Sequence, residues 1–142
     1  MKKIIIAFSL LLILGSCSTA KVKDTSKDLY QVLVSSDYGG ASFQFYETIT
    51  EEREFNMLLG DDEIKKFVKP DDIKTSNFIL VNLGEKSTSG YSAEIKSIVE
   101  LADKIIVEIV EKKPDESSMT LQTITNPYCV LKINSKKPIE IK

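Results

Sequence analysis

The sequence predicts a mainly β domain with a short helical insertion (α+β), built as an antiparallel β-sandwich or an open barrel. Three observations support this prediction. Stretches in which apolar and polar residues alternate recur through the second half of the chain, as in half-buried strands. Turn residues such as glycine, proline and asparagine separate these stretches. Only around residues 51–68 does the apolar spacing change to the period of a helix.

Two strands are predicted before the helical insertion. The first covers residues 29–35 and ends before Gly39 and Gly40, which can supply the positive φ of a turn. The second covers residues 41–49, where phenylalanines alternate with polar residues. The second strand is expected to be half-buried.

Two short helices are predicted within the insertion. Thr50 is the expected N-cap of the first helix, and Gly60 is its natural stop. The second helix is expected over residues 61–67, with Asp61 and Asp62 at its start. These aspartates predict capping rather than calcium binding, because the segment lacks the alternating acidic positions of an EF-hand loop.

The rest of the chain predicts strands joined by short turns. Residues 77–83 are almost continuously apolar, as in a central strand covered on both faces. Seven or eight strands are expected in all, and the short turns between them indicate an antiparallel sheet. The predicted later strands are residues 91–101, 104–113, 119–124, 128–134 and 139–141.

The first residues have the layout of an exported bacterial lipoprotein. Two lysines precede an apolar run of about 11 residues, which is too short for the ~20 needed to cross a bilayer. The run ends in Leu14-Gly15-Ser16-Cys17, which resembles a lipobox. We expect residues 1–16 to be a signal peptide, Cys17 to carry palmitate-like acyl chains, residues 17–28 to form a flexible tether and residues 29–142 to form a single domain.

The expected location is the bacterial cell envelope, with the lipid as membrane anchor. More than one acyl chain gives stable anchoring to a membrane. Ser18 stands where an aspartate would favour retention in the inner membrane, so the outer membrane is favoured if the cell has one.

Composition excludes several classes of function. The chain has no histidine, which removes Ser–His and Cys–His nucleophile pairs and nearly every catalytic zinc site. Cys129 lies in an apolar strand pattern and is expected to be a buried hydrophobic residue. The 19 basic and 21 acidic residues form no basic patch, which argues against nucleic acid as a partner. We predict a protein that is not an enzyme and that uses no metal or cofactor.

The stretch LGEKSTSGYSAEI, residues 83–95, is the candidate site. Gly84 and Gly90 are spaced nearly as in a phosphate-binding loop, but a tyrosine and a strand follow where that motif has lysine and a helix. A hairpin with an exposed tip and positive φ at Gly90 is predicted instead. The loop is longer than a tight hairpin needs, and Tyr91 combines a rigid face with a polar tip. It is therefore either a plain turn or a contact for a partner.

Several segments resemble the PrcB C-terminal domain family. FILVNLGEKSTSGYSAEIKSIVE, residues 78–100, is similar to its strand, Gly-Tyr loop and strand. KIIVEIVEKKP and LQTITNPYCVLKI resemble its later strands, including an Asn/Ser-Pro-Tyr element, and ITEEREFNMLL resembles its helix. The resemblance covers about residues 40–135. Ser89 departs from the family, which usually has a second glycine there.

The resemblance implies a non-catalytic binding module. The family is named for a lipoprotein subunit that associates with a cell-surface subtilisin-like protease and helps it to mature or remain stable. An exported protease or another envelope protein is thus the expected partner. The expected contact loop consists of Ser87, Thr88, Ser89, Gly90 and Tyr91. A second candidate contact consists of Asn126, Pro127 and Tyr128, which turn chemistry and core packing also explain.

Two other functions are compatible with the same residues. The loop is also similar to the Thr-Gly-Tyr loop of chagasin-type cysteine-protease inhibitors, which are β-sandwich proteins and would insert it into a protease cleft. The other alternative is a structural or small-ligand-binding lipoprotein, in which the loop is only a turn.

Overall fold

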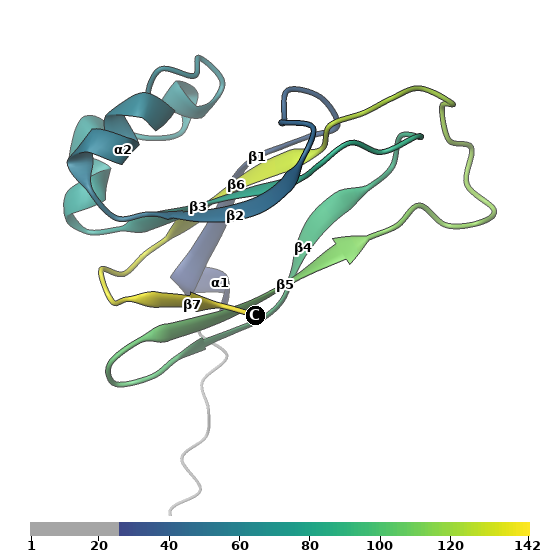
Figure 1. The fold of residues 1–142 in the computed structure, drawn as a ribbon. Coiled ribbons are helices and arrows are strands. Elements are labelled where there is room, and N and C mark those ends of the chain that lie inside the picture. The colour runs from purple at the N-terminus through teal and green to yellow at the C-terminus, as the bar shows by residue number, and fades with distance from the viewer. Residues whose placement is uncertain (1–25) are drawn as a thin grey trace, which may run out of the picture.

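The computed structural model describes residues 26–142, which form two β-sheets and one helical layer (Figure 1). The strands are β1 (Tyr30–Ser36), β2 (Gln44–Ile49), β3 (Asn77–Leu83), β4 (Ser92–Glu100), β5 (Ile105–Lys112), β6 (Tyr128–Ile133) and β7 (Ile139–Ile141). The helices are α1 (Ser26–Leu29), α2 (Glu52–Leu58) and the 3₁₀ turns η1 (Ile64–Lys66) and η2 (Pro70–Lys74). One sheet has the strand order β1-β6-β3-β2, and the other has the order β4-β5-β7. The predicted sandwich-like α+β class is confirmed.

The central strand β3 explains the layering. Its alternate side chains point to opposite faces of the four-stranded sheet, and both faces are buried. Ile79, Val81 and Leu83 pack into the core between the two sheets. Phe78 packs on the opposite face, where its ring stacks on that of Phe55 at a centroid distance of 4.6 Å. The prediction of a strand buried on both faces is confirmed.

The helical insertion covers part of the outer face of the four-stranded sheet (Figure 1). Its first helix begins later than predicted: Glu51, not Thr50, occupies the N-cap position and makes no side-chain capping bond. The Thr50 N–H instead donates to Glu54 Oε2 at 3.4 Å. The second predicted helix is reduced to the single turn η1, whose N-cap position is held by Glu63 without a side-chain bond. Asp61 precedes the turn and accepts bonds from the N–H groups of Glu63 and Ile64, whereas Asp62 pairs with Lys65.

The predicted hairpin between β3 and β4 is wrong. Both edges of β3 are taken, since it pairs with β2 on one side and β6 on the other. Strand β4 lies in the second sheet and pairs with β5. Residues 84–91 therefore carry the chain from one sheet to the other, which explains why this loop is longer than a tight hairpin requires.

Two further strand predictions need correction. Residues 119–124 form no strand, and the only β-bridge recorded near them joins Thr125 to Lys86. Strand β7 pairs with β5 in parallel, so the second sheet is not wholly antiparallel. The reason is that the chain crosses from β6 in one sheet to β7 in the other instead of turning back on its neighbour.

The N-terminal predictions fall mostly outside the part of the chain that the structure describes. The signal peptide and Cys17 lie there, as does most of the expected tether. The last residues of that tether lie in α1, where the Leu29 carbonyl accepts a bond from the Asn134 N–H at 2.8 Å. No helix within residues 26–142 is long and apolar enough to cross a membrane.

Candidate functional site

Three connecting loops meet at one end of the sandwich, and we call this region the loop end. It consists of residues 37–43 between β1 and β2, residues 84–91 between β3 and β4, and residues 113–127 between β5 and β6. Figure 1 shows the three loops on the same side of the molecule. The candidate contact residues lie in this region, so its internal bonding decides what it can present to a partner.

Hydrogen bonds fasten the Gly-Tyr loop to residues 113–127. Lys86 and Thr125 exchange two backbone bonds, of 2.8 and 2.9 Å. The Ser89 N–H donates to the Leu121 carbonyl at 3.1 Å, and the Leu121 N–H donates to Ser89 Oγ at 2.9 Å. The fully buried Thr125 hydroxyl donates to the Thr88 carbonyl at 3.0 Å. Of the residues expected to form an exposed tip, Thr88 and Ser89 are thus bonded within the protein, whereas Ser87 is exposed.

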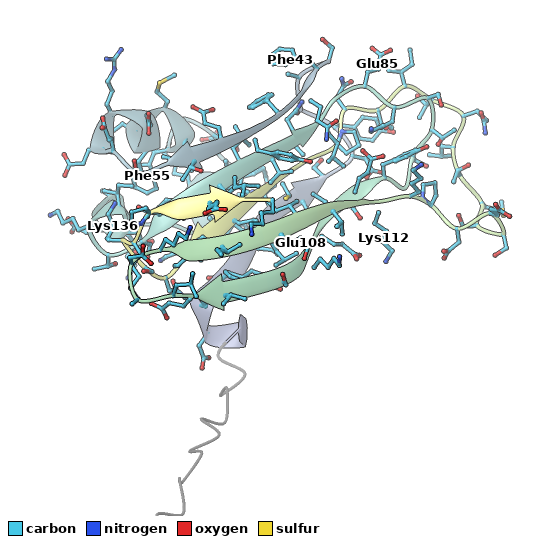
Figure 2. All side chains as sticks on the ribbon, turned by 60° about the horizontal axis from the view of Figure 1, so that its bottom comes forward. Phe43, Phe55, Glu85, Glu108, Lys112 and Lys136 are labelled. Carbon is cyan, nitrogen blue, oxygen red and sulfur yellow. The ribbon has the colours of Figure 1, made fainter. Side chains whose placement is uncertain are left out.

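The first loop joins the same network. The Glu85 N–H donates to the Ser42 carbonyl at 3.1 Å. The Asn126 N–H donates to the Asp37 carbonyl at 2.9 Å, and its side-chain amide donates to the Ala41 carbonyl at 3.2 Å. Phe43 and Glu85 accordingly appear along one edge of the molecule in Figure 2. The loop end therefore behaves as one bonded unit of three loops.

Tyr91 lies at the base of the loop and not at its tip. Its side chain is half-buried and packs against the core between the sheets. The Lys86 ammonium sits 5.3 Å from the centre of the Tyr91 ring and 2.7 Å from Glu111 Oε2. A cation over an aromatic face, itself held by a carboxylate, fixes the ring in place. Tyr91 therefore holds the loop as well as offering part of its surface.

Gly39 and Gly90 adopt the positive φ angles that the sequence predicts for these turns. Gly90 has a φ of 93°, in the left-handed region, and a Cβ there would lie 3.0 Å from Pro114 Cβ. Gly39, in the first loop, has a φ of 106°. At these turns only glycine fits without strain.

The predicted second contact divides between two environments. Pro127 is buried, Asn126 bonds within the loop end, and Tyr128 packs with the cluster under the helical layer. Tyr128 and Tyr91 therefore belong to different cores and do not form one surface. No peptide bond between described residues is cis, so the Asn126–Pro127 bond is trans.

Groups that could carry chemistry are scarce in the described part of the chain. It contains no set of three or more acidic, cysteine or histidine side chains placed to hold a metal ion. Cys129 is buried, as predicted, and burial raises the pKa of its thiol to about 11. Such a thiol stays protonated near neutral pH and is a poor nucleophile.

Part of the chain matches a known protein family. Residues 77–134 match the PrcB C-terminal family. The resemblance seen in the sequence is confirmed for this segment, which runs from β3 to just after β6 and starts later than residue 40. Comparison with curated proteins and with solved structures gave no significant match.

The matched segment, residues 77–134, also carries exposed apolar side chains that were not predicted to be site residues. Met119 is fully exposed, and Leu121 and Ile124 are 65% and 62% exposed. Phe43, in the neighbouring loop, is 65% exposed. The apolar residues of 119–124 are visible in the sequence, but their pattern predicts a strand and not a contact surface. The structure directs these side chains to solvent instead.

Proposed function

We propose that this protein is a lipid-anchored, non-catalytic envelope protein whose loop end binds an exported partner protein. One observation supports it most: apolar side chains are exposed on loops whose backbone is hydrogen-bonded in place. When a partner covers exposed apolar side chains, the free energy of the complex is lowered. A surface that is already ordered loses less conformational entropy on binding.

A surface protease is the first candidate for the partner. The match to the PrcB C-terminal family supports this choice, because it includes two of the three loops of the loop end. The absence of histidine from the sequence fits a protein that assists a protease without cleaving.

We favour docking by the loop end over insertion of the Gly-Tyr loop into a protease cleft. The Ser89 and Lys86 N–H groups, which an inserted loop would offer to an enzyme, donate to residues 121 and 125 of the same chain. Tyr91 packs against the core. Insertion would require these contacts to break.

The test is recovery of a partner from solubilised envelopes with an affinity-tagged full-length chain. We expect Leu121→Ser combined with Ile124→Ser to reduce the recovered partner at least about tenfold, since each exposed apolar side chain that becomes covered contributes roughly 1 kcal/mol or more. Val99→Ser is the matched control, because Val99 is 47% exposed on β4, outside the loop end. Equal recovery with the double variant and with the control would contradict the proposal.

The lipid anchor is tested separately. Metabolic labelling with a palmitate analogue should mark the wild-type chain and not Cys17→Ala, because acylation requires the Cys17 thiol. The variant should also appear in the soluble fraction, since the acyl chains are the proposed membrane anchor. Membrane retention of an unlabelled Cys17→Ala chain would show that something else anchors it.

A further inference from the structure

A concave surface lies on the outer face of the four-stranded sheet, next to the helical layer. The cavity has a volume of about 330 Å³ and lies between α2 and residues 39–41. Phe45 from β2, Leu80 from β3 and Tyr128 from β6 line it. We call this cavity the outer groove. Its floor is therefore made largely of apolar and aromatic side chains.

The other side chains of the outer groove give it negative charge. Glu47 from β2, Glu54 from α2 and Asp61 after α2 all line it, and no lysine or arginine does so. None of the ion pairs found among the described side chains involves these three carboxylates. An apolar surface with uncompensated negative charge is complementary to a ligand that is both apolar and cationic.

The phenol of Tyr128 lies on the floor of this groove. Burial, together with the charges of Asp61 and Glu63, raises the pKa of the Tyr128 phenol. The phenol therefore stays protonated at neutral pH and remains a hydrogen-bond donor on the groove floor.

The strand at the side of the outer groove is a sheet edge. Strand β2 is the last strand of the four-stranded sheet and pairs with β3 alone among the described strands. Its residues Phe45, Glu47 and Ile49 alternate along the strand and all line the groove. An edge strand offers unpaired backbone groups to an added extended segment, whose alternate side chains would then fall on the same face.

We propose that the outer groove binds an extended peptide segment of a partner protein in which apolar residues flank a lysine or arginine. The apolar side chains would cover Phe45 and Leu80, and the cation would lie among the three carboxylates. Glu47, Glu54 and Asp61 lie outside residues 77–134, whereas Leu80 and Tyr128 on the floor lie inside them, so only the acidic part of the groove lies beyond the family match. The proposal does not depend on binding at the loop end.

The experiment uses the detergent-solubilised full chain and two capped peptides, Thr-Val-Thr-Lys-Thr-Val-Thr, which places its valines and lysine on one face, and the same peptide with norleucine in place of lysine. NMR titration should move the resonances of Tyr128 and Phe45 with the lysine peptide. The norleucine peptide keeps the length and most of the apolar surface but lacks the charge. We expect it to bind several-fold more weakly, and we expect added salt to weaken only the lysine peptide.

Variants that each remove one carboxylate test whether the lysine peptide binds in the outer groove. Glu47→Gln and Glu54→Gln should each weaken the lysine peptide about two- to fivefold, the range of single exposed charge pairs. Asp103→Asn removes one charge at the turn between β4 and β5, and it should leave the affinity for the lysine peptide unchanged. Equal binding of the two peptides, full affinity in both glutamine variants, or no binding of the lysine peptide at millimolar concentration would each overturn the proposal. Loss of a loop-end partner leaves these results unaffected, so the two proposals fail separately.

Discussion

Asn82 shows how a single buried side chain positions the loop end. It is 1% exposed, and its Oδ1 accepts a bond from the Ala41 N–H at 2.8 Å. Its Nδ2 donates to the carbonyl oxygens of Ala41 and Phe43. One side chain on the central strand thus supplies bonds that hold the loop carrying the exposed ring of Phe43.

Asn82→Ala should lower the free energy of unfolding by about 2–4 kcal/mol, because it leaves backbone groups of residues 41 and 43 without their partner. Urea unfolding followed by circular dichroism measures the change. Asn56→Ala is the control: Asn56 is exposed on α2, and the expected change there is within about 0.5 kcal/mol. A loss below 1 kcal/mol in Asn82→Ala would mean that water replaces these bonds without penalty.

Cys129 gives a second prediction for a single residue. Burial raises its thiol pKa to about 11, so less than about 1% is thiolate at pH 8. In a Cys17→Ser background, a thiol reagent should react with Cys129 at least about a hundredfold more slowly in the native protein than in urea. Similar rates in both conditions would show that the core around β6 opens readily.

At the level of elements, one carboxylate links η2 to the sheet, in addition to the buried side chain of Ile73. Burial by itself would raise the pKa of Asp72, but the Lys69 N–H and the Lys132 ammonium lower it below its ordinary 3.8. The distances are 3.0 Å from Lys69 N to Asp72 Oδ2 and 3.0 Å from Lys132 Nζ to the same oxygen. Because the folded pKa is the lower one, the contribution is present above the unfolded pKa and is lost as the pH falls through the folded pKa.

Asp72→Ala should therefore destabilise the protein by about 1–3 kcal/mol at pH 7, through the lost cap and the lost charged bond. The difference from wild type should be smaller at pH 3, which lies below the ordinary carboxyl pKa of 3.8 and closer to the lowered pKa of folded Asp72. Urea unfolding at both pH values measures it. Asp71→Ala, which removes an exposed pair with Lys74, should change stability by less than about 1 kcal/mol. An equal difference at both pH values would contradict the role of the charge.

The elements also show where sequence reasoning succeeded. Strands 77–83 and 139–141 were predicted with their observed bounds, because continuous apolar residues and a short final run are local signals. The positive φ of Gly90 was predicted for the same reason.

Strand pairing could not be predicted from local sequence, because it depends on the whole sheet. The hairpin between β3 and β4 failed because β2 and β6, distant in sequence, take both edges of β3. A loop after residue 83 was predicted at its observed place in the chain, but the segments that lie beside it in space were not predicted. Residues 119–124 were predicted to form a strand because their pattern does not say whether the apolar side chains face a core or solvent.

At the scale of the whole molecule, two surfaces serve two proposed contacts. The loop end presents Met119, Leu121 and Ile124, while the outer groove presents apolar floor residues with negative charge. They are built from different loops and strands, although residues 39–41 contribute to both regions. A partner that covered both would contact an apolar surface and an acidic groove on neighbouring parts of the same fold.

Site-specific photo-crosslinking tests the central claim, that the loop end is the contact surface, most directly. A photoreactive phenylalanine analogue would replace Leu121 in the full-length chain in living cells, with Val99 on β4 as the matched exposed position. The account predicts a discrete crosslinked product with one envelope protein from position 121, and no such product from position 99. The same product from both positions, or from position 99 alone, would contradict it.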